Sequence, residues 1–190
     1  TGSADDAMLT NLAGNGTCDL REAIAAANTD TAVGECSAGS GADTIAFSLS
    51  YPATILLAAD LPPLTGNLTL QGPGAAALAV NGDASFRPLQ IAAGTVVTVS
   101  RLTLAGGRAA SSGPTANRGG AIFNEGTLTL LGVTVRDSVG IHYGGGIYNA
   151  GNLSMRATTV VSCLVSTYGG ALYNESNAVA AIEDGSQLGA

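Results

Sequence analysis

The sequence contains no lysine and no tryptophan, and it has only one histidine. Its seven basic residues are all arginines and face 14 acidic residues, so the formal net charge at pH 7 is −7. This charge argues against nucleic acid as a partner, because phosphate backbones are bound by basic surfaces. It is equally unsuited to anionic membrane surfaces and to polyanions. A single histidine also excludes a metal site built from several histidines.

Long apolar runs are absent as well. No stretch of about 18 apolar residues occurs, so we expect no membrane span. The chain begins Thr1-Gly2-Ser3 without a basic or an apolar leader segment, so we expect a signal peptide to be removed or absent. The expected strands carry no Asp-x-Asp-x-Asp run and no carboxylate cluster with ligand spacing, so we expect no metal and no cofactor.

One six-residue phrase occurs three times. It reads GGAIFN at 119–124, GGGIYN at 144–149 and GGALYN at 169–174, and the spacing is 25 residues both times. A fixed period of about 20–50 residues is typical of a solenoid. The runs between the phrases alternate apolar and polar residues, as in Val97-Thr98-Val99, which predicts strands rather than helices. We therefore predict an all-β fold, a parallel β-helix with about 25 residues per coil.

Each position of the phrase has an expected role. The first side chain of each short strand is apolar and is expected to point inward: Ile122, Ile147 and Leu172. The next is aromatic and is expected to point outward and to stack on its equivalents: Phe123, Tyr148 and Tyr173. The last is an asparagine at a turn, where side-chain amides one coil apart can hydrogen-bond to each other: Asn124, Asn149 and Asn174.

The chain is expected to form one domain with a cap. Residues 1–17 are expected to form a leading strand or loop, and residues 18–28 are the only convincing helix. Asp19 and Glu22 have the spacing of a capping box, and Asn28 can end the helix. Residues 1–42 are therefore predicted to be an N-terminal cap, and 43–190 the β-helix. Residues 108–118 are polar and small and are predicted to form a surface excursion, either a binding loop or a tolerated insertion.

The three cysteines differ in their surroundings. Cys18 and Cys36 flank the expected helix and a polar loop. By closing this loop, a disulfide between them would stabilise the fold by about 3 kcal/mol in the chain-entropy model. Such a bridge implies an oxidising, extracellular setting. Cys163 follows an expected strand and is either a buried small side chain or a partner in an intermolecular bridge.

The segment CDLREAIAAAN at 18–28, with a second cysteine in GECSAGSGADTIAF at 34–47, resembles the N-terminal region of secreted bacterial β-helix proteins of the CSLREA type. This chain has Asp19 where that motif has serine. The segments NLTLQGPG, VSRLTLAGG and the GGAIFN phrases are also similar to that family, and the phrases resemble the repeats of polymorphic outer-membrane proteins. The resemblance covers most of the chain. It implies a right-handed helix, secretion and surface association, and it assigns no catalytic residues.

Two sets of residues are candidates for binding or chemistry. The first set combines the aromatic residues of two neighbouring rows with one arginine, and it could stack on sugar rings or on a partner, or serve packing alone: Phe123, Tyr148, Tyr173, Tyr143, Tyr168 and Arg118. The second is a pair of carboxylates two coils apart, Glu125 and Glu175. Their expected separation of about 9.6 Å is close to that of inverting glycosidases, although solvated turn residues would show the same pattern.

These observations predict a non-catalytic, structural or adhesive module at a bacterial surface. The alternative is a carbohydrate-active enzyme or a carbohydrate-binding module, since many β-helices act on polysaccharides. After Asn174 the repeat fades without a cap, so either the natural chain continues or another surface covers that end. The expected partners are a second copy bound end to end, or a surface glycan or protein.

Overall fold

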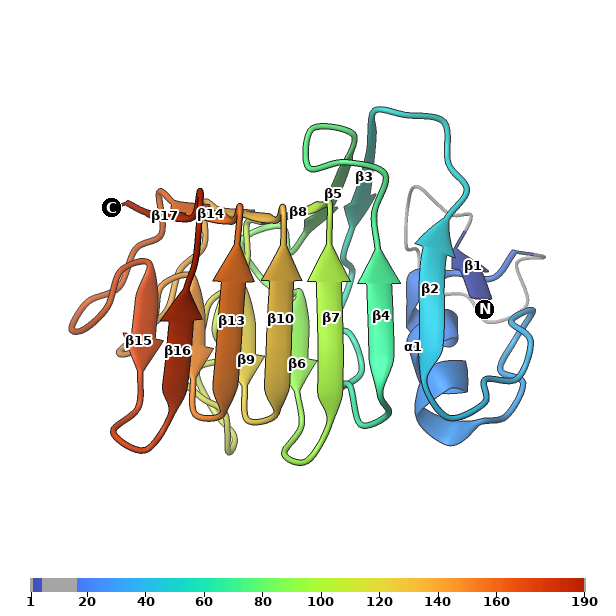
Figure 1. The fold of residues 1–190 in the computed structure, drawn as a ribbon, viewed down its shortest axis with the longest axis horizontal. Helices are drawn as coiled ribbons and strands as arrows, with labels where there is room; N and C mark the ends of the chain where they lie inside the picture. Colours follow the sequence, from blue (N-terminus) through green and yellow to red (C-terminus); the bar gives the residue numbers. More distant parts are fainter. Residues whose placement is uncertain (1, 5–16, 190) are drawn as a thin grey trace.

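The computed structural model describes residues 2–4 and 17–189. Its strands form three parallel sheets, and the chain passes from one sheet to the next in each coil. Figure 1 shows the strands side by side along the long axis, with helix α1 (Leu20–Thr29) at one end. The predicted β-helix is confirmed as a parallel β-solenoid of about 6 turns with about 25 residues per coil. Most of the leading segment 1–17 lies outside the described residues.

Sheet A is the largest of the three. Its seven strands are, in spatial order, β1 (Gly2–Ala4), β2 (Asp43–Phe47), β4 (Leu68–Gln71), β7 (Val96–Ser100), β10 (Thr127–Leu131), β13 (Asn152–Arg156) and β16 (Val179–Ile182). Every pair in this order is parallel and in register, so equivalent residues of successive coils lie next to each other.

Two smaller sheets complete each coil. Sheet B consists of β17 (Gln187–Leu188), β14 (Thr159–Val161), β11 (Thr134–Arg136), β8 (Thr103–Ala105), β5 (Leu78–Asn81) and β3 (Ala53–Leu56). Sheet C consists of β15 (Leu172–Asn174), β12 (Ile147–Asn149), β9 (Ile122–Asn124) and β6 (Leu89–Ile91). Sheet C is the one built from the repeated phrase.

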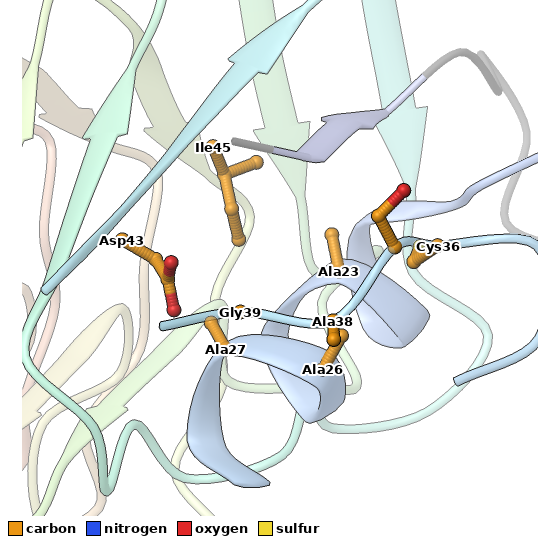
Figure 2. Close-up of a pocket in the computed structure, with 9 residues that line it drawn as sticks. Ala23, Ala26, Ala27, Cys36, Ala38, Gly39, Asp43 and Ile45 are labelled. Carbon is orange, nitrogen blue, oxygen red and sulfur yellow. The ribbon is translucent and has the colours of Figure 1, made fainter. Parts of the chain in front are cut away.

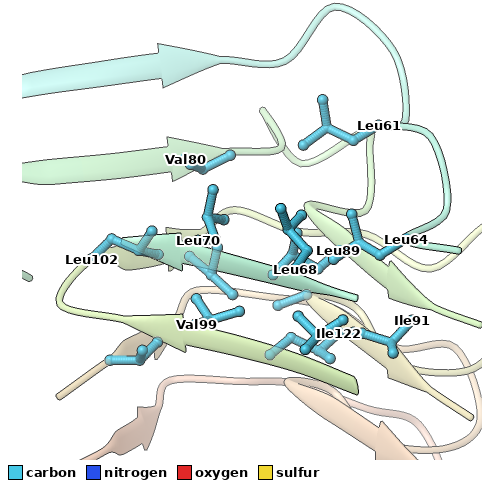
Figure 3. Close-up of a cluster of buried hydrophobic side chains, with 14 of the residues drawn as sticks. Leu61, Leu64, Leu68, Leu70, Val80, Leu89, Ile91, Val99, Leu102 and Ile122 are labelled. Atoms are coloured by element: carbon cyan, nitrogen blue, oxygen red, sulfur yellow. The ribbon is translucent and has the colours of Figure 1, made fainter. Parts of the chain in front are cut away.

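The core is assembled from rows of identical position. Because side chains alternate across a strand, every second residue faces inward, and it packs on its equivalent in the next coil. Five successive members of one such row of sheet A are at most 1% exposed: Ile45, Leu70, Val99, Leu130 and Met155. Figure 3 shows Leu68 and Leu70 of sheet A close to Leu89 of sheet C in this interior. A coil can bury these side chains only against its neighbours, so the coils stabilise one another.

The first end of the core is covered by helix α1. Asp19 caps the helix by accepting a hydrogen bond from Glu22 N at 2.8 Å, and Glu22 Oε2 accepts one from Asp19 N at 3.2 Å. Leu20 and Ile24 point into the solenoid and are at most 1% exposed. Arg21 ties the helix to the first coil through the carbonyl oxygens of residues 59 and 60. The predicted capping box and cap helix are therefore present.

Asn28 does not end the helix, contrary to the sequence interpretation. The helix continues through Thr29, and Asp30 takes the left-handed conformation that terminates it. Asn28 instead bonds to the turn before β4: its Oδ1 accepts from Thr65 N and Gly66 N, and its Nδ2 donates to a carbonyl oxygen. The side chain is used to attach the cap to the solenoid.

Cys18 and Cys36 form a disulfide across the cap, whereas Cys163 is a free, buried thiol. We expect the double substitution Cys18→Ala with Cys36→Ala to lower the free energy of unfolding by about 3 kcal/mol, because it restores chain entropy to the unfolded state. Urea denaturation measures this difference. The unsubstituted chain under reducing conditions is the control and should show the same loss. Equal stability of all three samples would contradict a role of the bridge in holding the cap.

The last described coil differs from the others in exposure. Ile182 and Leu188 continue the inward rows of Met155 and Val160, yet they are 47% and 42% exposed. Apolar side chains at positions that are buried elsewhere therefore face solvent here. None of the helices in the described part of the chain has the length and apolar character needed to cross a membrane.

Candidate functional site

The asparagines of the repeated phrase form a hydrogen-bonded ladder. Asn124 Nδ2 donates to Asn149 Oδ1 at 2.7 Å, and Asn149 Nδ2 donates to Asn174 Oδ1 at 2.7 Å. The same amides also donate to carbonyl oxygens of neighbouring turns, among them those of Gly151 and Val179. Asn124 and Asn149 are completely buried. All three side chains join neighbouring coils, and those of Asn124 and Asn149 are not accessible to a ligand.

The aromatic residues of the phrase stack as expected. The rings of Phe123 and Tyr148 are 5.3 Å apart and nearly parallel, and those of Tyr148 and Tyr173 are 5.4 Å apart. They lie on the opposite side of β9, β12 and β15 from the core residues of the same strands, because side chains alternate. We call this row the ring ladder.

Two of the three rings of the ring ladder are buried. Phe123 and Tyr148 are only 1% and 2% exposed, so neither presents a ring face to solvent. Their faces are covered by arginines: the Arg87 guanidinium carbon is 5.5 Å from the Phe123 centroid, and that of Arg118 is 5.2 Å from the Tyr148 centroid. Tyr173, at the end of the ladder, is half-buried.

A second row runs beside the ring ladder. Arg118, Tyr143 and Tyr168 pair with each other in successive coils, and the two tyrosine rings stack at 5.9 Å. The first two members of this row lie over rings of the following coil, with Arg118 over Tyr148 and Tyr143 at 4.8 Å from Tyr173. Tyr168 covers no such ring and is 58% exposed.

Arg87 was not identified from the sequence. The residue is 4% exposed, and its guanidinium donates to Gly119 O, Thr115 Oγ1, Thr115 O and Arg118 O at 2.7–3.0 Å. Burial lowers the pKa of this guanidinium, and nearby Asp60 opposes the change. The FRPL segment around it carries no repeat signal, so only the three-dimensional contacts reveal that this arginine holds the excursion against the ring ladder.

The predicted excursion, residues 108–118, lies in the connection between β8 of sheet B and β9 of sheet C. Arg108 pairs with Val139 and Arg118 with Tyr143, so nine residues fill a connection that takes three in the next coil. Residues 111–114 are exposed, while Ala109 is buried. The base of the loop is closed by a hydrogen bond from Asn117 N to the carbonyl of residue 110 at 2.8 Å. The segment is thus pinned at its base and open at its tip.

A polar recess lies beside the ring ladder. It is lined by side chains from three consecutive coils: Arg118, Tyr143, Tyr148, Tyr173 and Glu175. Five of the eight residues singled out from the sequence are therefore brought together here. Phe123 and Tyr168 lie outside the lining, as does Glu125.

Glu125 and Glu175 occupy equivalent positions after the asparagine ladder, two coils apart. Glu125 N donates to Ile91 O, and Glu175 N donates to Asn149 O in the same manner. Glu125 is exposed, whereas Glu175 is half-buried in the recess. Their surroundings thus differ, and their role as a catalytic pair stays a prediction.

Tyr148 is the titratable group at the floor of the recess. Burial raises the pKa of its phenol to about 12, a hydrogen bond with Glu175 adds to the increase, and the charge of Arg118 opposes it. A phenol with this pKa stays protonated near neutral pH. An efficient general base has a pKa close to the working pH, so this phenol is poorly suited to that role. Tyr148 therefore keeps its proton beside the Glu175 carboxylate near neutral pH.

A second recess lies between the cap and the first coil. Figure 2 shows Asp43 and Ile45 of β2 facing the alanines of helix α1. Asp43 Oδ1 accepts from Ser40 N at 2.9 Å, while its buried Oδ2 has no hydrogen-bond partner within the described residues. Gly39 is required beside it, because a Cβ there would lie 2.3 Å from Oδ2. Small side chains and one carboxylate make this a packing junction.

Across residues 2–4 and 17–189, no group of three or more His, Cys, Asp or Glu side chains is arranged to hold a metal ion. Comparison with protein-family models, with curated proteins and with solved structures gives no match for this chain.

Proposed function

We propose that the chain is a non-catalytic structural and adhesive module outside the cell, at a bacterial surface. The observation that supports this most directly is the use of the repeated residues. Asn124 and Asn149 of the asparagine ladder and the first two rings of the ring ladder are buried between coils. The residues that define the repeat thus hold a regular rod together, and the side walls remain for contact with other molecules.

The extracellular setting is supported by the disulfide between Cys18 and Cys36. Disulfides persist in oxidising compartments and are rare where thiols are kept reduced. The location at a bacterial surface is proposed from the resemblance of the cap and the repeats to secreted bacterial β-helix proteins.

End-to-end association of copies is the second part of this proposal. The two edges of sheet A are β1 and β16, at opposite ends of the rod, and an open strand edge can pair with another chain. Ile182 and Leu188 add exposed apolar surface at the β16 end. A contact between β16 of one copy and the cap of the next would be head-to-tail and would produce a filament.

Light scattering across protein concentration, with negative-stain microscopy, tests this association. We expect the apparent mass to rise with concentration and linear particles to form. Ile182→Lys should abolish the rise, because a charged edge resists strand pairing. Val96→Lys is the matched control, since Val96 is 54% exposed on β7 in the middle of the same sheet. Monomers at every concentration, or equal inhibition by both variants, would count against self-association.

A further inference from the structure

The recess beside the ring ladder has the composition of a ligand site. Its walls come from residues that lie far apart in sequence, and three of its five side chains are tyrosines. The ring of Tyr143 is tilted by 54° against that of Tyr173, while Tyr148 forms the buried floor. Binding sites for small molecules are typically concave and combine ring surfaces with a few charged groups, as here.

The Arg118 guanidinium can donate hydrogen bonds to a ligand. One face of its guanidinium lies over Tyr148 at 5.2 Å, and the only ion pair among the described residues joins Arg136 to Asp137 instead. No hydrogen bond from the Arg118 guanidinium to protein is seen in the described part of the chain. Its N–H groups are therefore available to an acceptor in the recess.

Glu175 supplies the complementary acceptor. Its carboxylate lies beside Tyr148 in the recess and raises the pKa of that phenol. A carboxylate has about four lone-pair sites, so most of its accepting capacity remains. The recess thus presents a cationic donor, an anionic acceptor and phenol hydroxyls next to ring edges.

We propose that this recess binds a pyranose unit of a neutral polysaccharide. Neighbouring sugar hydroxyls both donate and accept, so one can accept from Arg118 while the next donates to Glu175. The apolar C–H faces of the sugar ring suit the half-buried rings of Tyr143 and Tyr173. A net charge of −7 favours a neutral polymer over an acidic one. The inference rests on the adhesive role proposed above and names its ligand.

Calorimetric titration of the whole chain with cellohexaose, xylohexaose and mannohexaose tests the site, with hexagalacturonate as the acidic comparison. We expect saturable binding of at least one neutral oligosaccharide, with a Kd of about 1 mM or tighter. Glu175→Gln and Arg118→Met should each weaken it about tenfold, because each removes a charged hydrogen-bonding group. Near-UV circular dichroism verifies that the variants keep their aromatic packing.

The matched controls are Glu183→Gln and Arg156→Met, which remove the same charges from exposed positions outside the recess. They should bind like the unsubstituted chain. Three results would overturn the proposal: no neutral oligosaccharide binds, the recess variants bind as well as the controls, or hexagalacturonate is preferred. Light scattering on the same samples measures end-to-end association, which does not depend on the recess. A failure of sugar binding can therefore be distinguished from a failure of the proposed function.

Discussion

We expect Asn149→Asp to lower the free energy of unfolding at pH 7 by about 3–5 kcal/mol, because it leaves an uncompensated charge in the interior. Asn149 is completely buried, and its Nδ2 donates to the carbonyl oxygens of Gly151 and Val179 and to Asn174 Oδ1. The substitution changes one amide nitrogen to oxygen and keeps the size of the side chain. An ionised carboxylate would then face three oxygen atoms. Urea denaturation measures the loss.

The same variant has a predicted pH dependence. Burial and the surrounding oxygens raise the pKa of the introduced carboxyl in the folded state above the value of about 3.9 in the unfolded chain. The unfolded state then loses its proton first as the pH rises, so the penalty grows above pH 4. Below that pH both states hold the proton and the charge penalty is absent. The stability difference from the unsubstituted chain should therefore be smallest below about pH 4 and increase up to pH 7.

Asn174→Asp is the matched control at the end of the same ladder. Asn174 is exposed, and its Oδ1 accepts from Asn149, a bond that a carboxylate can also accept. Its Nδ2 donates to the carbonyl oxygens of Glu175 and Ala178, and water can replace these two exposed bonds. We expect a loss below about 1 kcal/mol with little dependence on pH. If both variants lose the same stability, the burial of the ladder is not the cause.

Arg87→Met should release the excursion from the wall and destabilise the fold by about 2–4 kcal/mol. The substitution keeps a long apolar side chain over Phe123 but removes four hydrogen bonds to residues 115–119, each worth about 1 kcal/mol or more when the donor is charged. Part of the loss is offset because the variant buries no charge. Thermal unfolding measures the stability, and limited proteolysis with mass spectrometry locates new cleavage within residues 109–117.

Arg156→Met is the control for this prediction. Arg156 is exposed, and its loss should change stability by less than about 0.5 kcal/mol. Cleavage outside the excursion, or none at all in a destabilised Arg87 variant, would mean that Arg87 supports the solenoid and not the loop.

The coil architecture was predictable from the sequence because it depends on local periodicity. A 25-residue period with alternating apolar residues admits only a stack of short strands, and the rows of Val99 and Leu130 follow from that register. The capping box of Asp19 and Glu22 is also a local signal, since it requires only the spacing of two residues. The cysteine pair on either side of the helix identified the disulfide in the same way.

The exposure of the aromatic rows was not predictable, because it depends on contacts between coils. A strand pattern places Phe123 and Tyr148 outside the core, yet it does not reveal that Arg87 and Arg118 cover them. The position of Arg118 beside Tyr143 was expected from the repeat, whereas its lean over the following coil was not. Asn28 was assigned to the helix end for a similar reason, since its partners lie more than 30 residues away.

Polysaccharide turnover tests the non-catalytic role most directly. The chain is incubated with the neutral oligosaccharides and with hexagalacturonate, and NMR follows reducing ends and unsaturated products in the same samples in which binding is measured. We predict that bound oligosaccharides remain intact. Product formation that is lost in Glu125→Gln or Glu175→Gln, but not in Glu183→Gln, would show a carbohydrate-active enzyme and contradict a purely structural and adhesive module.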